Sequence, residues 1–183
     1  RPKASHKGAY GHLLIVGGCD DLRGAPLLAG EAALHSGVGL VTLASISSVT
    51  GPVTSKSPDI MTHNLKDDSG FISAESVDEI IAQLENKTAL AFGCGFGKGK
   101  GASRLVAEII KRVDKPLLID ADGLNALAED ISVLNEKASQ NIVLTPHPGE
   151  MARLIGGSTA DVQKDRLNIA RDFAVKNNVT LVL

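Results

Sequence analysis

The amino-acid sequence predicts an α/β fold, a three-layer α/β/α sandwich around a mainly parallel sheet. Short apolar runs alternate with longer amphipathic segments along the 183 residues. The apolar runs lack the polar and apolar alternation of half-exposed strands, as is typical of parallel strands buried on both faces. Aromatic residues make up only 3% of the chain and glycines number 19. Ala, Val, Ile and Leu must therefore fill the core between many tight turns.

The predicted elements alternate regularly after a linker-like start over residues 1–7. Strands are predicted where the sequence is apolar and β-branched, and helices where apolar residues recur at every third or fourth position. The predicted strands are 12–16, 40–44, 60–64, 89–92, 116–120, 141–145 and 179–183. The predicted helices are 25–35, 77–84, 105–113, 123–128, 149–155 and 161–176, with a further short helix within 45–68.

Two local signals refine this division of the chain. Ser76 is followed by Glu79 three residues later, which predicts a capping box at the start of the helix over 77–84. The sequence contains no internal repeat or low-complexity linker and stops at Leu183, within a predicted strand. We therefore expect a single domain, residues 1–183, that lacks its C-terminal part.

Composition excludes several classes of protein. Lys and Arg number 19 against 21 Asp and Glu, so no basic excess is present for wide contact with phosphate backbones or anionic lipids. The apolar runs are too short for a membrane span, and no signal-peptide pattern occurs. Two cysteines, Cys19 and Cys94, have no disulfide or metal-ligand spacing. We expect a cytoplasmic protein without nucleic-acid or membrane partners.

Unusual residues follow four of the predicted strands, where parallel sheets gather their ligands. Glycine pairs after the first strand allow close approach of a ligand or simply make a tight turn. The alternating glycines of residues 93–101 suit an anion-binding nest, a relaxed dinucleotide fingerprint or a solvated loop. Asp120 and Asp122 could hold a metal, a hydroxyl group or a proton, whereas Asp122 could also cap the next helix.

The last of these four strands, 141–145, leads into Thr-Pro-His-Pro-Gly-Glu, residues 145–150. Two prolines restrict the backbone on either side of His147, so its imidazole is presented in a fixed direction. Thr145 could cap the following helix, and the charge of Glu150 suits the first helical turn. A structural hydrogen bond is the alternative for His147; the rigid loop favours a binding role.

Taken in chain order, the motifs around the predicted strands resemble those of the NAD(P)H-hydrate dehydratase family of the ribokinase-like superfamily. The resemblance covers almost the whole chain. It is carried by HKGAYG, GGCDDLRGAPLLAGEAALHSGVGLVTLA, LIDADGLNAL and VLTPHPGE. It implies ATP- or ADP-dependent phosphorylation of hydrated NADH or NADPH (S epimer), followed by phosphate loss that restores the reduced ring, with Mg²⁺ accompanying the nucleotide. Another ribokinase-like vitamin-precursor kinase and a non-catalytic dinucleotide-binding module are the alternatives.

The resemblance also implies particular residues. Ala25, Gly95 and His147 match positions that contact the hydrated dinucleotide. Supporting positions at the same site are Gly18, Asp120, Asn125 and Glu150. No metal ligand is implied within the chain, and the family's catalytic Asp would lie beyond Leu183, so that the chain alone is expected to be inactive. Cys94 and Phe96 stand where the family usually has Pro and Leu.

The family further implies a homo-oligomer, such as a tetramer, and an epimerase domain that is fused to the dehydratase or paired with it. Hydrated NADH or NADPH and an adenine nucleotide are the small-molecule partners that it implies.

Overall fold

A computed structural model describes residues 2–183; Arg1, the first residue of the linker-like start, lies outside the described residues. Within them, seven strands form one sheet in the order β3-β2-β1-β6-β7-β8-β9, with every neighbouring pair parallel. The strands are β1 His12–Val16, β2 Leu40–Ser45, β3 Ile60–Asn64, β6 Ala89–Phe92, β7 Leu117–Ile119, β8 Ile142–Leu144 and β9 Thr180–Leu181. The predicted parallel sheet is confirmed.

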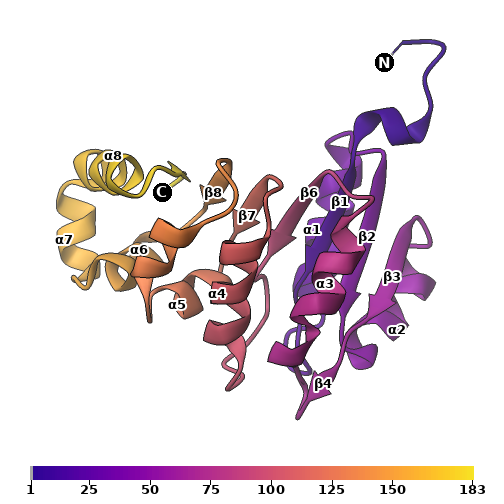
Figure 1. The fold of residues 1–183 in the computed structure, drawn as a ribbon, viewed down its shortest axis with the longest axis horizontal. Helices are drawn as coiled ribbons and strands as arrows, with labels where there is room; N and C mark the ends of the chain where they lie inside the picture. Colours follow the sequence, from indigo (N-terminus) through magenta and orange to yellow (C-terminus); the bar gives the residue numbers. More distant parts are fainter. Residues whose placement is uncertain (1) are drawn as a thin grey trace.

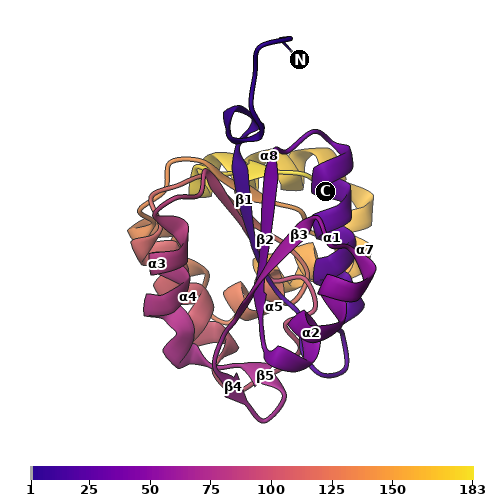
Figure 2. The same ribbon diagram turned by 90° about the vertical axis from the view of Figure 1, so that its right-hand side faces the viewer.

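Helices cover both faces of this sheet, so the predicted three layers are present. Helices α1 and α2 pack on one face and α3 and α4 on the other (Figures 1 and 2). The α-helices are α1 Gly24–His35, α2 Ser47–Lys56, α3 Val77–Leu84, α4 Ala102–Arg112, α5 Asp122–Leu127, α6 Pro148–Ile155, α7 Thr159–Lys164 and α8 Arg166–Asn177. Three short 3₁₀ helices are η1 Lys7–Tyr10, η2 Ala74–Ser76 and η3 Ile131–Glu136.

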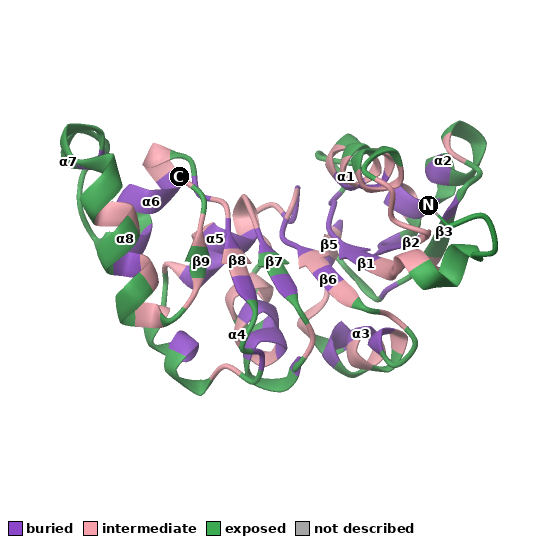
Figure 3. Ribbon diagram, turned by 90° about the horizontal axis from the view of Figure 1, so that it is seen from above, coloured by how far each residue is buried: buried purple, intermediate pink, exposed green. Residues whose placement is uncertain are grey.

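The core lies where the central strands are covered on both sides. Leu14, Ile15 and Val16 of β1 have no exposed surface, and the middle of the sheet is buried between the helices in Figure 3. This accounts for the unbroken apolar runs, because both faces of a central parallel strand must be apolar. Among residues 2–183, no helix combines the length and apolarity needed to span a bilayer.

The strand order places a topological switch point between β1 and β6. From β1 the chain adds β2 and β3 on one side, then returns to place β6 on the other side of β1. Ligands of open parallel sheets bind outside the carboxyl ends of the strands at such a point. The loops that follow β1 and β6 are therefore the strongest candidates for a binding surface.

Two sequence expectations about helix boundaries are wrong. Ser76 does not cap α3: its Oγ accepts the backbone N–H of Lys66 at 3.2 Å, whereas Ser73 caps the preceding turn η2. The long helix predicted over 161–176 is two helices, α7 and α8, which meet at Asp165. Asp165 has a non-helical backbone, and its carboxylate caps α8 by accepting the N–H of Asn168.

A two-stranded hairpin, β4 Asp67–Asp68 and β5 Phe71–Ile72, was not predicted from the sequence. Its turn places Ser69 and Gly70 at positive φ angles of 57° and 86°. Strands of two residues are too short to produce a hydrophobic period, so only the turn chemistry could have indicated them. This hairpin lies at the carboxyl edge of the large sheet and matters for the loops described below.

His12 gives the fold a predictable response to pH. Its Nε2 lies 2.8 Å from Thr42 Oγ1, and burial followed by the positive charge of Lys87 lowers the pKa of the imidazole. The unfolded chain therefore takes up this proton near pH 6.5, before the folded chain does, so stability falls as the pH drops below that value. The free energy of unfolding, measured with denaturant at pH 8 and pH 5, should fall less in His12→Gln than in the wild type. Equal losses in the two proteins would contradict this assignment.

Candidate functional site

The loop after β1 is held tightly against the loop after β6. Gly18 has a φ of 84°, and its backbone N–H donates to the carbonyl oxygen of Cys94 at 2.9 Å. A Cβ at Gly18 would lie 2.9 Å from Val49 and 3.1 Å from Pro26. Gly18 is thus required because the loop after β1 packs closely against α1 and α2, which agrees with the tight-turn interpretation of this glycine pair.

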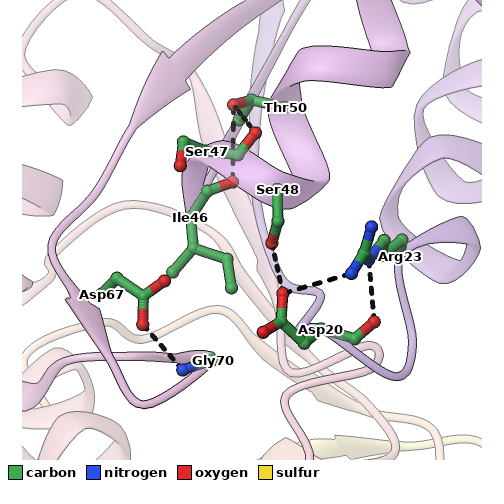
Figure 4. Close-up of polar contacts among 8 residues, drawn as sticks. All are labelled: Asp20, Arg23, Ile46, Ser47, Ser48, Thr50, Asp67 and Gly70. Atoms are coloured by element: carbon green, nitrogen blue, oxygen red, sulfur yellow. Dashed lines mark hydrogen bonds and ion pairs between the residues drawn. The ribbon is translucent and has the colours of Figure 1, made fainter.

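The same loop is fastened by a polar cluster around Asp20 that was not predicted (Figure 4). The Asp20 carboxylate accepts the hydroxyl of Ser48 at 2.6 Å and lies 3.5 Å from the guanidinium of Arg23. The Asp20 backbone N–H donates to Gly70 of the hairpin at 2.9 Å, and the N–H of Gly70 donates to Asp67 at 2.7 Å. The hairpin and α2 therefore fix the position of the loop that leads into α1.

Ala25 and Gly95, two of the predicted substrate-binding residues, lie side by side. A Cβ built on Gly95 would lie 3.2 Å from the Cβ of Ala25 and 2.9 Å from the carbonyl oxygen of Leu22. Gly95 also has a φ of 70°, a conformation that favours glycine. The loops after β1 and β6 thus meet at the switch point with almost no side-chain volume between them.

Three further glycines of the loop after β6 pack against the hairpin and the short helix η2. A Cβ at Gly97 would lie 2.7 Å from the ring of Phe71, and one at Gly99 would lie 2.9 Å from the same side chain. One at Gly101 would lie 2.9 Å from Ala74. Packing against the hairpin and η2 therefore accounts for these three glycines without a bound dinucleotide.

The loop after β7 reaches across to the glycine loop. The Asp122 carboxylate accepts the N–H of Gly97 at 2.9 Å and the side-chain amide of Asn125 at 3.2 Å, rather than capping α5. Asp120 lies half-buried at the end of β7. Between them Ala121 has φ 50° and ψ −119°, a sparsely populated conformation for a residue with a side chain. Such strain persists where surrounding contacts hold it in place.

His147 and Glu150 form a complete capping box at the start of α6. His147 Nδ1 accepts the backbone N–H groups of Gly149 and Glu150 at 3.0 and 3.3 Å, and the Glu150 carboxylate accepts the N–H of His147 at 2.9 Å. The N-cap is thus His147, not Thr145. With Nδ1 accepting, the proton of the neutral ring lies on Nε2, 3.3 Å from Glu150 Oε1. The Glu150 side chain is 7% exposed and that of His147 62%.

The seven predicted site residues therefore share one edge of the sheet but differ in how close they lie to the switch point. Gly18 and Gly95 belong to the interlocked loops after β1 and β6, and Ala25 lies in the first turn of α1 against Gly95. Asp120 and Asn125 follow β7, next to β6, whereas His147 and Glu150 follow β8, two strands from β6. A cavity of about 610 Å³ lies elsewhere, among η3, α6 and α8, and none of the seven residues lines it.

Cys94 of the glycine loop is predicted to be unreactive. Burial, followed by the negative charge of Asp120, raises the pKa of its thiol to about 11. The thiolate is then about one thousandth of the population at pH 8, and only the thiolate is a good nucleophile. Iodoacetamide followed by peptide mapping should label Cys94 at least about tenfold more slowly in the folded protein than in urea. Equal rates in both would contradict this prediction.

The sheet order and the two helical layers define a three-layer α/β sandwich with a ribokinase-like fold. The fold matches a ribokinase-like superfamily protein of Enterococcus faecalis with a TM-score of 0.81 at 22% identity, covering 100% of this chain and 60% of that chain. Residues 13–183 match the NAD(P)H-hydrate dehydratase family, and the chain belongs to this family.

Relatives and a solved structure agree with that membership. A bifunctional NAD(P)H-hydrate repair enzyme of Moorella thermoacetica is 43% identical over all of this chain and 34% of the relative. An ADP-dependent (S)-NAD(P)H-hydrate dehydratase of Neisseria meningitidis is 37% identical over all of this chain and 58% of the relative. The ADP/ATP-dependent NAD(P)H-hydrate dehydratase of Bacillus subtilis, co-crystallised with ATP and Mg²⁺, has a TM-score of 0.78 at 29% identity, covering 100% and 61% of the two chains.

Proposed function

We propose that the protein repairs hydrated nicotinamide nucleotides, converting the S epimer of hydrated NADH or NADPH to the reduced dinucleotide at the expense of ATP or ADP. The contact between Gly95 and Ala25 at the switch point carries the proposal, because it brings two matched positions together at the carboxyl edge of the sheet. Family membership over residues 13–183 supports the reaction class. The chain spans about a third of the bifunctional Moorella relative and 58% of the Neisseria relative.

The chain's own residues supply the substrate side of this reaction. Ala25 and Gly95 have little side-chain bulk, so the loop after β6 packs directly on the start of α1, and a ring or a sugar would lie on the partly exposed Ala25 side of this contact. The capping box fixes the imidazole of His147, whose Nε2–H faces Glu150 Oε1 at 3.3 Å, and the substrate would compete with that carboxylate for this donor. The hydrated ring would therefore lie along the strand ends, from β1 and β6 toward β8.

The nucleotide supplies the phosphoryl group that the added ring hydroxyl accepts, and departure of phosphate restores the double bond of the reduced ring. Within residues 2–183, no group of three or more His, Cys, Asp or Glu side chains is arranged to hold a metal ion. We therefore propose that Mg²⁺ enters with the nucleotide, bound by its phosphates.

The proposal includes three further points that the family suggests. The protein would be a homo-oligomer such as a tetramer, which sedimentation would establish. An epimerase, fused or separate, would supply the S epimer. The repair would take place in the cytoplasm, where the dinucleotides are used.

The test is direct. The protein in its full natural length is incubated with hydrated NADH and either ATP or ADP, and the absorbance of reduced nicotinamide is followed. Recovery with at least one nucleotide is expected. Binding without recovery would favour a non-catalytic dinucleotide-binding module. If phosphate were transferred only to a vitamin precursor's hydroxymethyl group, the protein would be a different ribokinase-like kinase. Either result would overturn the proposal.

A further inference from the structure

Three hydrogen bonds connect the strand ends of β6, β7 and β8 in a single line. Arg153 of α6 donates from Nη1 to Asn125 Oδ1 at 2.7 Å, and Asn125 Nδ2 donates to Asp122 Oδ1 at 3.2 Å. The other oxygen of Asp122 accepts the backbone N–H of Gly97 at 2.9 Å. The line thus runs from the helix that His147 caps to the loop that contains Gly95.

The chemistry of this line leaves little freedom at its centre. The amide oxygen of Asn125 faces a guanidinium donor and its amide nitrogen faces a carboxylate, so the flipped orientation would lose both bonds. With Oδ1 of Asp122 held by the amide, Oδ2 is directed at the N–H of Gly97. Charged groups at both ends strengthen the bonds to the neutral amide between them.

We propose that Arg153 is a positioning residue: through Asn125 and Asp122 it holds the glycine loop in register with α6, so that Gly95 and His147 present one surface to the dinucleotide. The inference rests on the proposed function for its effect on substrate, but its structural part stands on the three hydrogen bonds alone. In this proposal Arg153 acts through Asn125 and not by contact with the substrate.

A role in simple stability does not account for this arrangement. Arg153 is exposed and its partner Asn125 is half-buried, and hydrogen bonds at such positions contribute little to the free energy of unfolding. The effect of Arg153 is therefore on alignment of the loop. Substituting it should leave the melting temperature close to that of the wild type while changing the order of the glycine loop.

The first experiment needs no ligand. Hydrogen exchange of the Gly97 backbone amide is measured by NMR in the wild type, Arg153→Ala, Arg153→Lys and a matched control, Arg171→Ala, whose exposed arginine pairs with its neighbour Asp172. Exchange at Gly97 should be about three- to tenfold faster in Arg153→Ala, partly restored in Arg153→Lys and unchanged in the control. Unchanged exchange in Arg153→Ala would overturn the proposal.

The second experiment separates positioning from catalysis in the full-length protein. In Arg153→Ala, KM for hydrated NADPH should rise about three- to tenfold, with kcat and the KM for the nucleotide within about twofold of the wild type. Asn125→Ala should raise this KM at least as much, because Asn125 is itself a predicted site residue, and the double variant should be no worse than Asn125→Ala alone. Additive rises in KM, or a loss confined to kcat, would contradict the proposed role of Arg153. If the wild type shows no turnover, the proposed function fails, whereas the exchange measurement still decides whether Arg153 positions the glycine loop.

Discussion

Gly95→Ala is expected to reduce kcat/KM for hydrated NADPH by about 100-fold or more. The added methyl group would lie 2.9 Å from the carbonyl oxygen of Leu22 and 3.2 Å from the Cβ of Ala25. A φ of 70° adds backbone strain for any residue other than glycine. The loop must therefore shift at the point where it meets α1, and displacements of about 1 Å are enough to disrupt a bound substrate's alignment.

The matched control is Gly51→Ala in α2, where an added Cβ meets nothing within 4 Å. This change should leave activity unaltered, and the free energy of unfolding should stay within about 1 kcal/mol of the wild type, because the helix preference of alanine is offset by contact of its Cβ with the ring of Pro52. Gly95→Ala should lower that free energy by about 1–3 kcal/mol, with the protein still folded at 25 °C. Wild-type kcat/KM in folded Gly95→Ala would show that the loop takes no part in substrate binding.

Replacing His147 is the second change with a large expected effect, and it requires two variants. His147→Ala removes both the imidazole and the N-cap of α6, so the free energy of unfolding should fall by about 1 kcal/mol. His147→Asn keeps a side-chain oxygen that can accept the same backbone N–H groups, so its stability should stay within about 0.5 kcal/mol of the wild type.

Both variants should nevertheless bind hydrated NADPH about tenfold or more weakly, because each lacks the exposed Nε2–H. Isothermal titration for affinity and denaturant unfolding for stability separate the two roles. If His147→Asn bound as tightly as the wild type, the histidine would serve only to cap α6.

The fold was readable from the sequence because its signals are local. Apolar runs such as the one in β1 and helical periods such as the one in α4 depend on neighbouring residues alone. The errors occurred where distant groups decide the outcome. Ser76 bonds to the backbone of Lys66, and the hairpin after β3 is held by its contacts with the first loop rather than by its own short strands.

The features of the site likewise divide into those with a local sequence signal and those that depend on distant segments. Ala25, Gly95 and His147 could be matched to the family because their motifs are contiguous in sequence. The packing of Phe71 on the glycine loop and the bond between Arg153 and Asn125, 28 positions apart, join separate segments and leave no periodic signal. The capping box at His147 and Glu150 was detectable from their spacing, had histidine been considered as an N-cap.

The central claim is that the carboxyl ends of β1, β6 and β8 form the surface that binds the hydrated dinucleotide. A crystal structure of the full-length protein with hydrated NADPH tests it most directly. The claim predicts that the ligand contacts Ala25, Gly95 and the imidazole of His147. A ligand seated instead in the cavity among η3, α6 and α8, with those three residues free of contact, would contradict it.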